Sequence, residues 1–264
     1  MMTIASTRVD AIDAITGIFK RFTVPMDSDV LERDVRELCR NFRILAAAGL
    51  LVEADIGKFS ANLARAGINW AGLLRNCRTY GVRAPKMSDL AALFGALAGG
   101  HYPLASTLAR LMKDQDRQAN EYPAEYAFAR LFVYLTLSEE LTVGQVRALA
   151  DDLLVAGGKL TGERAAMACT LAEGDPRAFY AAFADMAEEQ ELYTERLAAA
   201  FTTDWRTFVA ERYIWLEGLA WLRLAAARGW TRPREFPYCS SLVLDVQPPV
   251  YQPDWILPPF RTAE

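Results

Sequence analysis

Apolar residues recur at intervals of three and four along most of the chain, the spacing that places them on one face of a helix. Each such series predicts an amphipathic helix with one buried stripe, as Leu31, Val35, Leu38, Phe42 and Leu45 illustrate. The pattern predicts helices at about 6–21, 28–48, 55–78, 88–98, 101–114, 122–137, 141–156, 161–173, 176–200 and 205–228.

Start and stop signals lie where the periodic segments begin and end. Thr142 with Gln145 forms a capping box, and Asp175 precedes a proline at a first helical turn. Glycines such as Gly174 follow several apolar runs and predict helix ends. Short connections imply antiparallel neighbours, and no fixed-period repeat is present, so we predict an all-α, irregular bundle of about ten antiparallel helices.

The segment 205–228 differs from the others because its apolar residues fall at nearly every angle around the helix. A helix of this kind is buried on most sides, so we expect one long rod with Trp205, Trp215 and Trp221 at the centre of the core. Glu217 lies in its most apolar part and needs a partner from elsewhere. Arg130 and Arg212 are the first candidates for that partner.

Composition changes after residue 232, where seven of the twelve prolines fall within Pro233–Pro259. We therefore divide the chain into a helical domain, 1–232, and an extended tail, 233–264. Large aromatics bury substantial area, so we expect the tail to pack on the helical domain. Its expected anchors are Phe236, Tyr238, Tyr251, Trp255 and Phe260, and a short strand-like stretch is expected at Leu242, Leu244 and Val246.

Charge and cysteine usage exclude several classes of protein. A formal net charge of −4 leaves no basic surface for a nucleic-acid backbone. The four cysteines have no CxxC spacing, which favours buried, reduced thiols over a metal site or disulfides: Cys39, Cys77, Cys169 and Cys239. Charges interrupt the apolar N-terminus, and no stretch is long and apolar enough for a membrane span, so a cytoplasmic protein is expected.

Candidate chemistry is sparse. His101 is the only histidine, and its position after two glycines is typical of an exposed helix start. No glycine-rich phosphate loop occurs, so no cofactor and no catalytic activity are expected. The alternative to a protein without catalytic activity is a helical, magnesium-dependent hydrolase, with carboxylates drawn from Asp114, Asp116, Asp151 and Asp152.

The segment 176–200 carries an acidic run formed by Asp185, Glu188, Glu189, Glu191 and Glu195. It lies opposite an apolar stripe of Phe179, Phe183, Met186, Tyr193 and Leu197. Two interpretations stay open. The run is either the solvated face of a helix or, together with Asp151 and Asp152, a surface that meets a basic protein.

The run ERYIWLEGLAWLRLA at 211–225, followed by Arg228-Gly229 and by EFPY at 235–238, resembles the C-terminal signature of the immunity protein 49 family. A second stretch at 121–137 is similar to the family's mid-chain pattern. The residues that carry both matches are Glu125, Tyr126, Arg130, Glu211, Arg212, Glu217 and Arg223.

The resemblance implies a cytosolic antidote that binds one cognate bacterial toxin, often a nuclease, and blocks it. The matching residues are mostly suited to burial, so we interpret them as fold determinants. The toxin-facing surface is then expected on exposed residues outside the signature. The candidates are Asp151, Asp152, Asp185, Glu188, Glu189 and Glu191. In the context of this resemblance, the magnesium-dependent hydrolase would be one that reverses a toxin's modification. A further alternative is a scaffold that uses the proline-rich tail as a ligand.

Overall fold

The computed structural model describes residues 3–22, 24–137, 141–200, 203–245, 251 and 257–261. Throughout these residues the regular secondary structure is helical, which confirms the all-α prediction. The helices are α1 (Ile4–Arg21), α2 (Ser28–Glu53), α3 (Ile56–Tyr80), α4 (Ala91–Ala98), α5 (Tyr102–Met112), α6 (Pro123–Thr136), α7 (Val143–Ala156), α8 (Thr161–Glu173), α9 (Pro176–Ala199), α10 (Trp205–Glu211), α11 (Leu216–Ala227) and α12 (Ser241–Asp245).

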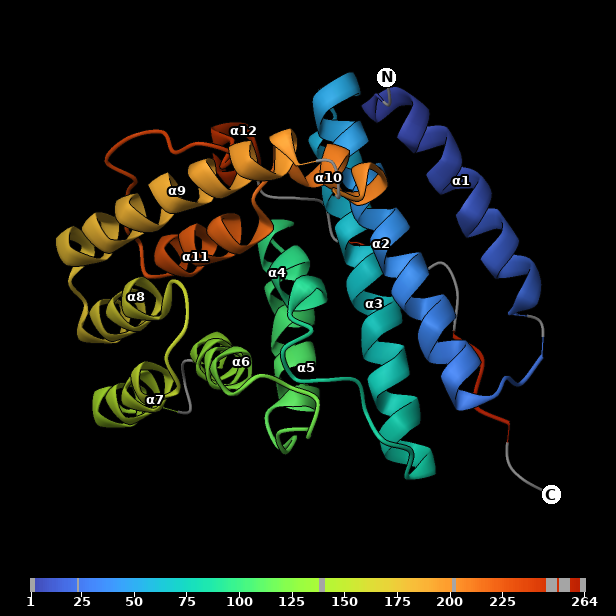
Figure 1. The fold of residues 1–264 in the computed structure, drawn as a ribbon, viewed down its shortest axis with the longest axis horizontal. Coiled ribbons are helices and arrows are strands. Elements are labelled where there is room, and N and C mark those ends of the chain that lie inside the picture. The colour runs from blue at the N-terminus through green and yellow to red at the C-terminus, as the bar shows by residue number, and fades with distance from the viewer. Residues whose placement is uncertain are drawn as a thin grey trace.

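Helices that follow one another in the chain mostly pack side by side, so the molecule is an irregular bundle (Figure 1). The long helices α1, α2 and α3 form one end, α4 and α5 lie in the middle, and α6 to α9 form the other end. The exception to chain order is α11, which returns between α9 and α4. It therefore joins the end formed by α6 to α9 to the middle of the bundle.

Helix starts follow the sequence signals in most places. The capping box of Thr142 and Gln145 is present, and the Asp175 carboxylate accepts a hydrogen bond from the Ala178 backbone N–H at 3.0 Å. Gly174 ends α8 in the left-handed conformation, with φ of +80°. The helix predicted at 88–98 begins only at Ala91, and before it the Ser88 N–H donates to the buried Glu121 carboxylate at 2.7 Å.

The prediction of one long helix over 205–228 is wrong, because the chain leaves the helix at Arg212 and starts a new one at Leu216. A long helix that is apolar on every side needs neighbours on every side along its whole length. The break divides it into two shorter helices, so fewer neighbours are needed. It buries Ile214 and Trp215 against the core while Trp205 and Tyr213, which had been expected inside, lie at the surface.

A contact between Trp215 and Gly218 holds the break in place. The Trp215 backbone N–H donates to the Tyr238 carbonyl at 3.0 Å, so the residue is tied to the tail and cannot continue a helix. Its indole ring lies directly on the first turn of α11. A Cβ atom at Gly218 would lie only 2.1 Å from the ring, so this position requires glycine.

Trp221 of α11 lies at the centre of the core, where α6, α9 and α11 meet. Its side chain is fully buried, and its ring makes an edge contact with Phe132 at a centroid distance of 5.0 Å. Phe179 of α9 lies against it at 6.3 Å. The expectation that this segment organises the core is therefore confirmed for α11, but not for the whole of 205–228.

The strand-like stretch expected at 242–246 is instead the short helix α12, and Val246 lies outside the described residues. The physical reason is an arginine on a neighbouring helix. The buried Arg223 guanidinium donates to the carbonyls of Val243 and Leu244, the latter at 3.0 Å, and so satisfies the end of α12 without a partner strand. Burial lowers the pKa of Arg223 from its ordinary value, and the hydroxyl of Tyr102 raises it less.

The described part of the tail contacts both ends of the bundle. Near its start, the Phe236 ring packs edge-on against Phe183 of α9 at 4.7 Å. Near its end, Phe260 is buried beside Tyr80 of α3, and the Arg261 N–H donates to the Met26 carbonyl at 2.8 Å. Trp255 lies outside the described residues.

The cysteines and the helix lengths agree in most respects with the sequence expectations. Three of the four thiols are buried and Cys169 is partly exposed, and the four are free of disulfides: Cys39, Cys77, Cys169 and Cys239. Desolvation raises the pKa of Cys39 to about 12. Within the described residues, every helix is too short or too polar to span a bilayer.

Replacing Gly218 by alanine is expected to destabilise the fold. The new methyl group would overlap the Trp215 ring, so the indole must leave its site. We expect the free energy of unfolding to fall by about 2–4 kcal/mol, measured by urea denaturation.

The matched control is Gly17→Ala in α1, where a Cβ meets no atom within 4 Å. That change improves helix propensity and should alter stability by about 1 kcal/mol or less, in the stabilising direction. Equal destabilisation by both variants would show that the Trp215 contact does not matter.

Candidate functional site

A groove of about 630 Å³ lies between α6, α8, α9 and the start of α11. We call it the α6–α9 groove. A volume of this size is within the range of ligand or side-chain docking sites. Its lining includes three carboxylates that the sequence had singled out for separate reasons, namely Glu125, Glu189 and Glu217. These three residues, which are far apart in the sequence, therefore lie around one groove in the folded chain.

Glu217 and Arg164 form the floor of the groove. The guanidinium of Arg164 on α8 donates to both carboxylate oxygens of Glu217, with distances of 2.8 and 2.7 Å. The same guanidinium lies 3.8 Å from the centroid of the Phe128 ring, in a cation–π contact. Arg164 of the first turn of α8, and not Arg130 or Arg212, is thus the partner of Glu217.

Lys159 and Tyr193 form one rim of the groove. The Lys159 ammonium lies 5.2 Å from the centroid of the Tyr193 ring and 3.6 Å from the Glu189 carboxylate. Tyr193 was expected in the buried stripe of α9, but its side chain is 46 % exposed. It faces the groove because the loop before α8, and not a helix, covers this part of α9.

The opposite rim is the first turn of α6. Tyr122 is 72 % exposed there, and Glu125 is also exposed. Tyr126 points the other way, and its hydroxyl donates to the Gln115 carbonyl at 3.0 Å. Two tyrosines at the groove, Tyr122 and Tyr193, thus present large amphipathic side chains to solvent.

The loop that joins α7 to α8 shapes the groove by an unusual backbone. Gly158 has φ of +108°, a region that essentially only glycine adopts, and Leu160 has φ of +61°. Leu160 occupies the position before the first turn of α8 without a side-chain cap. The left-handed residue turns the chain so that Lys159 and Thr161 both line the groove.

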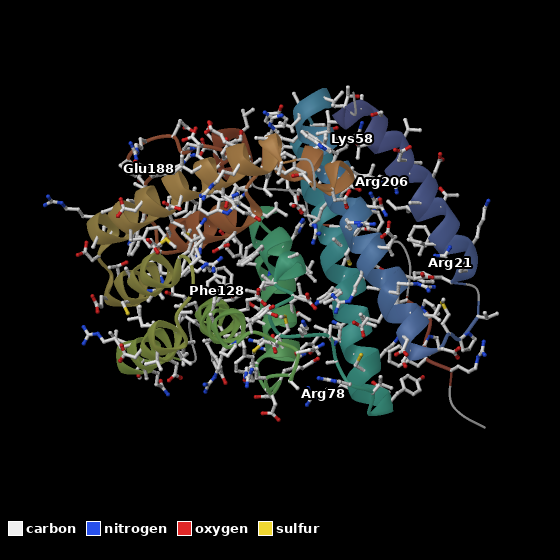
Figure 2. All side chains as sticks on the ribbon, in the orientation of Figure 1. Arg21, Lys58, Arg78, Phe128, Glu188 and Arg206 are labelled. Atoms are coloured by element: carbon white, nitrogen blue, oxygen red, sulfur yellow. The ribbon has the colours of Figure 1, made fainter. Side chains whose placement is uncertain are left out.

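The remaining acidic candidates lie outside the groove. Asp185, Glu188 and Glu191 are exposed on α9, and Figure 2 shows Glu188 pointing away from the body of the bundle. Asp151 and Asp152 are exposed on α7, which α8 separates from α9 (Figure 1). The structure therefore does not unite the two acidic groups in one surface.

Signature residues outside the groove differ in their burial. Arg130 lies 3.5 Å from the Asp152 carboxylate at the surface, and Glu211 is exposed 3.9 Å from Arg43. Arg212 is partly buried, with its guanidinium 5.4 Å from the Tyr213 ring. Only Arg223 is a fully buried member of this set. The expectation of burial is thus wrong for Glu125 and Glu211, which carry exposed side chains.

Arg164 and Lys159 were missed from the sequence. Each is a single basic residue beside a helix start, a context that occurs on many solvated surfaces. Arg164 can be recognised only from the position of Glu217, which lies 53 residues further along the chain.

The groove can bind through charge, hydrogen bonds and aromatic contact. Its carboxylates are paired with cations at Glu189 and Glu217, while Glu125 is exposed at the edge. The described residues contain no group of three or more His, Cys, Asp or Glu side chains placed to hold a metal ion. Asp114 and Asp116, the other carboxylates of the hydrolase alternative, are exposed beyond α5.

Comparison of the chain with protein-family models, with curated proteins and with solved structures found no match. The resemblance of 211–225 to the immunity protein 49 family therefore stays a prediction.

His101 is the residue before α5, as expected, but it is partly buried and not exposed. Its Nε2 lies 2.8 Å from the Ser60 hydroxyl and 3.0 Å from the Ser60 carbonyl, which favours a proton on that nitrogen. Burial lowers the pKa of His101 below its usual 6.5, although the bond to the Ser60 carbonyl opposes the shift. The imidazole is a packing element joining α3 to α5.

Glu217→Gln is expected to destabilise the protein more than the loss of a surface ion pair. The neutral amide keeps the size of the side chain but leaves the Arg164 charge, only 20 % exposed, without its counterion. Because some water still reaches the pair, we expect the free energy of unfolding to fall by about 2 kcal/mol in urea denaturation.

Glu173→Gln is the matched control, since Glu173 accepts two hydrogen bonds from Arg147, a side chain that is 61 % exposed. Its expected effect is about 0.5 kcal/mol or less. If both variants lowered the free energy of unfolding by the same amount, the Glu217–Arg164 pair would matter no more than a surface ion pair.

Acid should weaken the fold through His101. The pKa of His101 is lower in the folded protein than in the unfolded chain, so the unfolded chain takes up a proton first as the pH falls. Protonation of the unfolded chain favours unfolding, so stability is lost as the pH falls below 6.5. The loss ends below the folded pKa, where both states are protonated. We expect the stability advantage of the wild type over His101→Gln to be smaller at pH 5.5 than at pH 7.5, measured by urea denaturation at both values. An unchanged difference would contradict the burial effect.

Proposed function

We propose that this chain is an immunity protein that binds a cognate bacterial toxin in the cytoplasm and neutralises it by covering the toxin's active site. In this proposal the chain is not an enzyme and uses no cofactor, and it acts by forming a heteromeric complex. A nuclease effector is one class of toxin that fits, because nucleases carry basic clefts that an acidic protein can cover.

The observation that carries the proposal is a set of exposed carboxylates on the outer face of α9. Asp185, Glu188, Glu191 and Glu195 are exposed, and among the described residues none has an ion-pair partner within 4.0 Å. Carboxylates that are left unpaired within their own protein can pair with Lys and Arg of another at little internal cost. This face is therefore suited to a basic partner.

Aromatic and apolar side chains beside these carboxylates supply the second requirement of a tight interface. Leu192 is 51 % exposed on α9, and Tyr193 and Tyr122 flank the α6–α9 groove. Tyrosines are frequent hot spots, since one side chain buries a large area and also forms a hydrogen bond. Protection from a toxin calls for a Kd near about 1 nM, or roughly −12 kcal/mol, which charge alone does not provide.

The family resemblance of 211–225 supports the same proposal from the sequence. Its residues lie mainly in α11 and in the break before it, and α11 packs against α9, one wall of the groove. A family signature that builds the scaffold and leaves the binding face variable suits a set of antidotes that each recognise a different toxin.

Reversing two charges on the outer face of α9 should impair neutralisation. We expect Asp185→Lys with Glu188→Lys to weaken binding to the toxin encoded beside this chain by about tenfold to a hundredfold, mainly through slower association. The measurement is surface plasmon resonance with the purified toxin, accompanied by growth of cells that express both proteins.

The matched control is Asp10→Lys with Asp13→Lys on α1, because both residues are exposed and have the same spacing at the opposite end of the bundle. It changes the net charge by the same amount and should leave binding within about threefold of the wild type. Equal cell death with and without the wild-type chain would refute the proposed function. Equal weakening by the two double variants would refute the assignment of the α9 face.

A further inference from the structure

A second concave site lies on the other side of the molecule, between α2, α3 and the start of α4. We call it the α2 arginine cleft. Its volume is about 340 Å³, and its lining includes Trp70, Asp89 and the first residues of α4. Four arginines of α2 project into it at spacings of three, four and three residues, which places them along one face of the helix: Arg33, Arg36, Arg40 and Arg43.

Arginine side chains are concentrated in this cleft, although the chain as a whole carries a charge of −4. Its lining contains four guanidinium groups and two carboxylates, Glu37 and Asp89. Carboxylates outside the lining, among them Glu32 and Asp34, also contact these arginines. Arg206 of α10 adds a further positive charge near Glu37, and Figure 2 shows Arg206 beside α2. Clustered arginines repel one another, so an anion bound among them is stabilised by several charges.

Two of the four arginines are held firmly by carboxylates. Arg36 contacts Glu32 and Asp89, each at 2.8 Å, and lies over the Trp70 ring at 5.2 Å from its centroid. Arg40 is paired with Glu37, and this pair raises the pKa of Arg40. These side chains form a fixed wall of the cleft.

The other two arginines keep donors that the described residues do not use. Arg33 is 71 % exposed and reaches Asp34 only at 3.5 Å, while Arg21 holds that carboxylate at 2.8 Å. The nearest carboxylate oxygen to Arg43 belongs to Glu211, at 3.9 Å. The buried Nε of Arg43 has no hydrogen-bond acceptor among the described residues. Leaving such a donor unsatisfied is unfavourable, so the protein's own residues do not fully compensate the Arg43 guanidinium.

The start of α4 favours an anion at the same place. Ala91 and Ala92, its first two residues, line the cleft, and Leu90 before them provides no side-chain cap. The backbone N–H groups of a first helical turn carry partial positive charge and lack partners within the helix. Together with the arginines they form a site with donors on two sides.

We propose that the α2 arginine cleft binds a small dianion of the phosphate-monoester class. The planar guanidinium groups donate in pairs to phosphate oxygens, and a volume of about 340 Å³ accommodates a phosphorylated sugar but not a protein domain. The site lies outside the α6–α9 groove and does not depend on the proposed toxin. The phosphate has two possible sources, an organic ester or inorganic phosphate.

Isothermal titration calorimetry on the full chain tests the site with three probes, ribose 5-phosphate, inorganic phosphate and ribose. All titrations are made at a constant ionic strength of about 0.15 M, so that screening of charges is the same in each. We expect ribose 5-phosphate to bind with a Kd below about 1 mM and ribose not to bind. Equal affinity for inorganic phosphate would identify the free anion as the source, and weaker affinity would identify the ester.

Arg33→Gln and Arg43→Gln should each weaken binding about tenfold, the effect of losing one charge-assisted hydrogen bond. The matched control is Arg78→Gln, since Arg78 is exposed at the end of α3, away from the cleft (Figure 2), and it should bind as the wild type does. Arg33 is exposed, so its variant keeps the fold and decides the test even where Arg43→Gln unfolds. Absence of binding by both phosphates, or equal weakening in Arg78→Gln, would overturn the proposal.

Discussion

The burial of α11 is the constraint on which the rest of the structure depends. This helix has no polar stripe, since its residues from Gly218 to Ala225 are all buried, including the charged Arg223. Such a helix is stable only when other elements surround it. Helices α4 and α9 cover two sides, and α12 satisfies the guanidinium of Arg223 on another. The position of α9, one wall of the α6–α9 groove, follows from this arrangement, and the Arg164–Glu217 pair links α8 to the first turn of α11.

Local signals predict the fold where the determinants are close in sequence. The capping box at Thr142 and the left-handed glycine at Gly174 need only a few residues, and both were predicted. The break before α11 could not be predicted, because it depends on a hydrogen bond between the Trp215 N–H and the Tyr238 carbonyl, whose partners meet only in the folded chain. The apolar pattern identified what is buried, but not how the chain bends to bury it.

The candidate site was predictable in its parts but not as a whole. Glu217 was notable for its apolar surroundings, Glu189 for an acidic run and Glu125 for a family pattern. That they lie around one groove depends on the tertiary structure. The tertiary structure also determines that Arg164, and not another arginine, is the ion-pair partner of Glu217. The periodicity of α2 placed apolar residues on one face, but it did not indicate that the arginines between them line a second concave site.

The packing of α4 on α11 has a consequence for synthesis on the ribosome. Helix α4 is composed of alanine, leucine, phenylalanine and glycine, and most of its residues are buried in the finished protein. It leaves the ribosome more than a hundred residues before α11, its principal neighbour on that side. A nascent chain therefore carries an uncovered apolar helix until its last quarter emerges, which makes the growing polypeptide a natural client for chaperones.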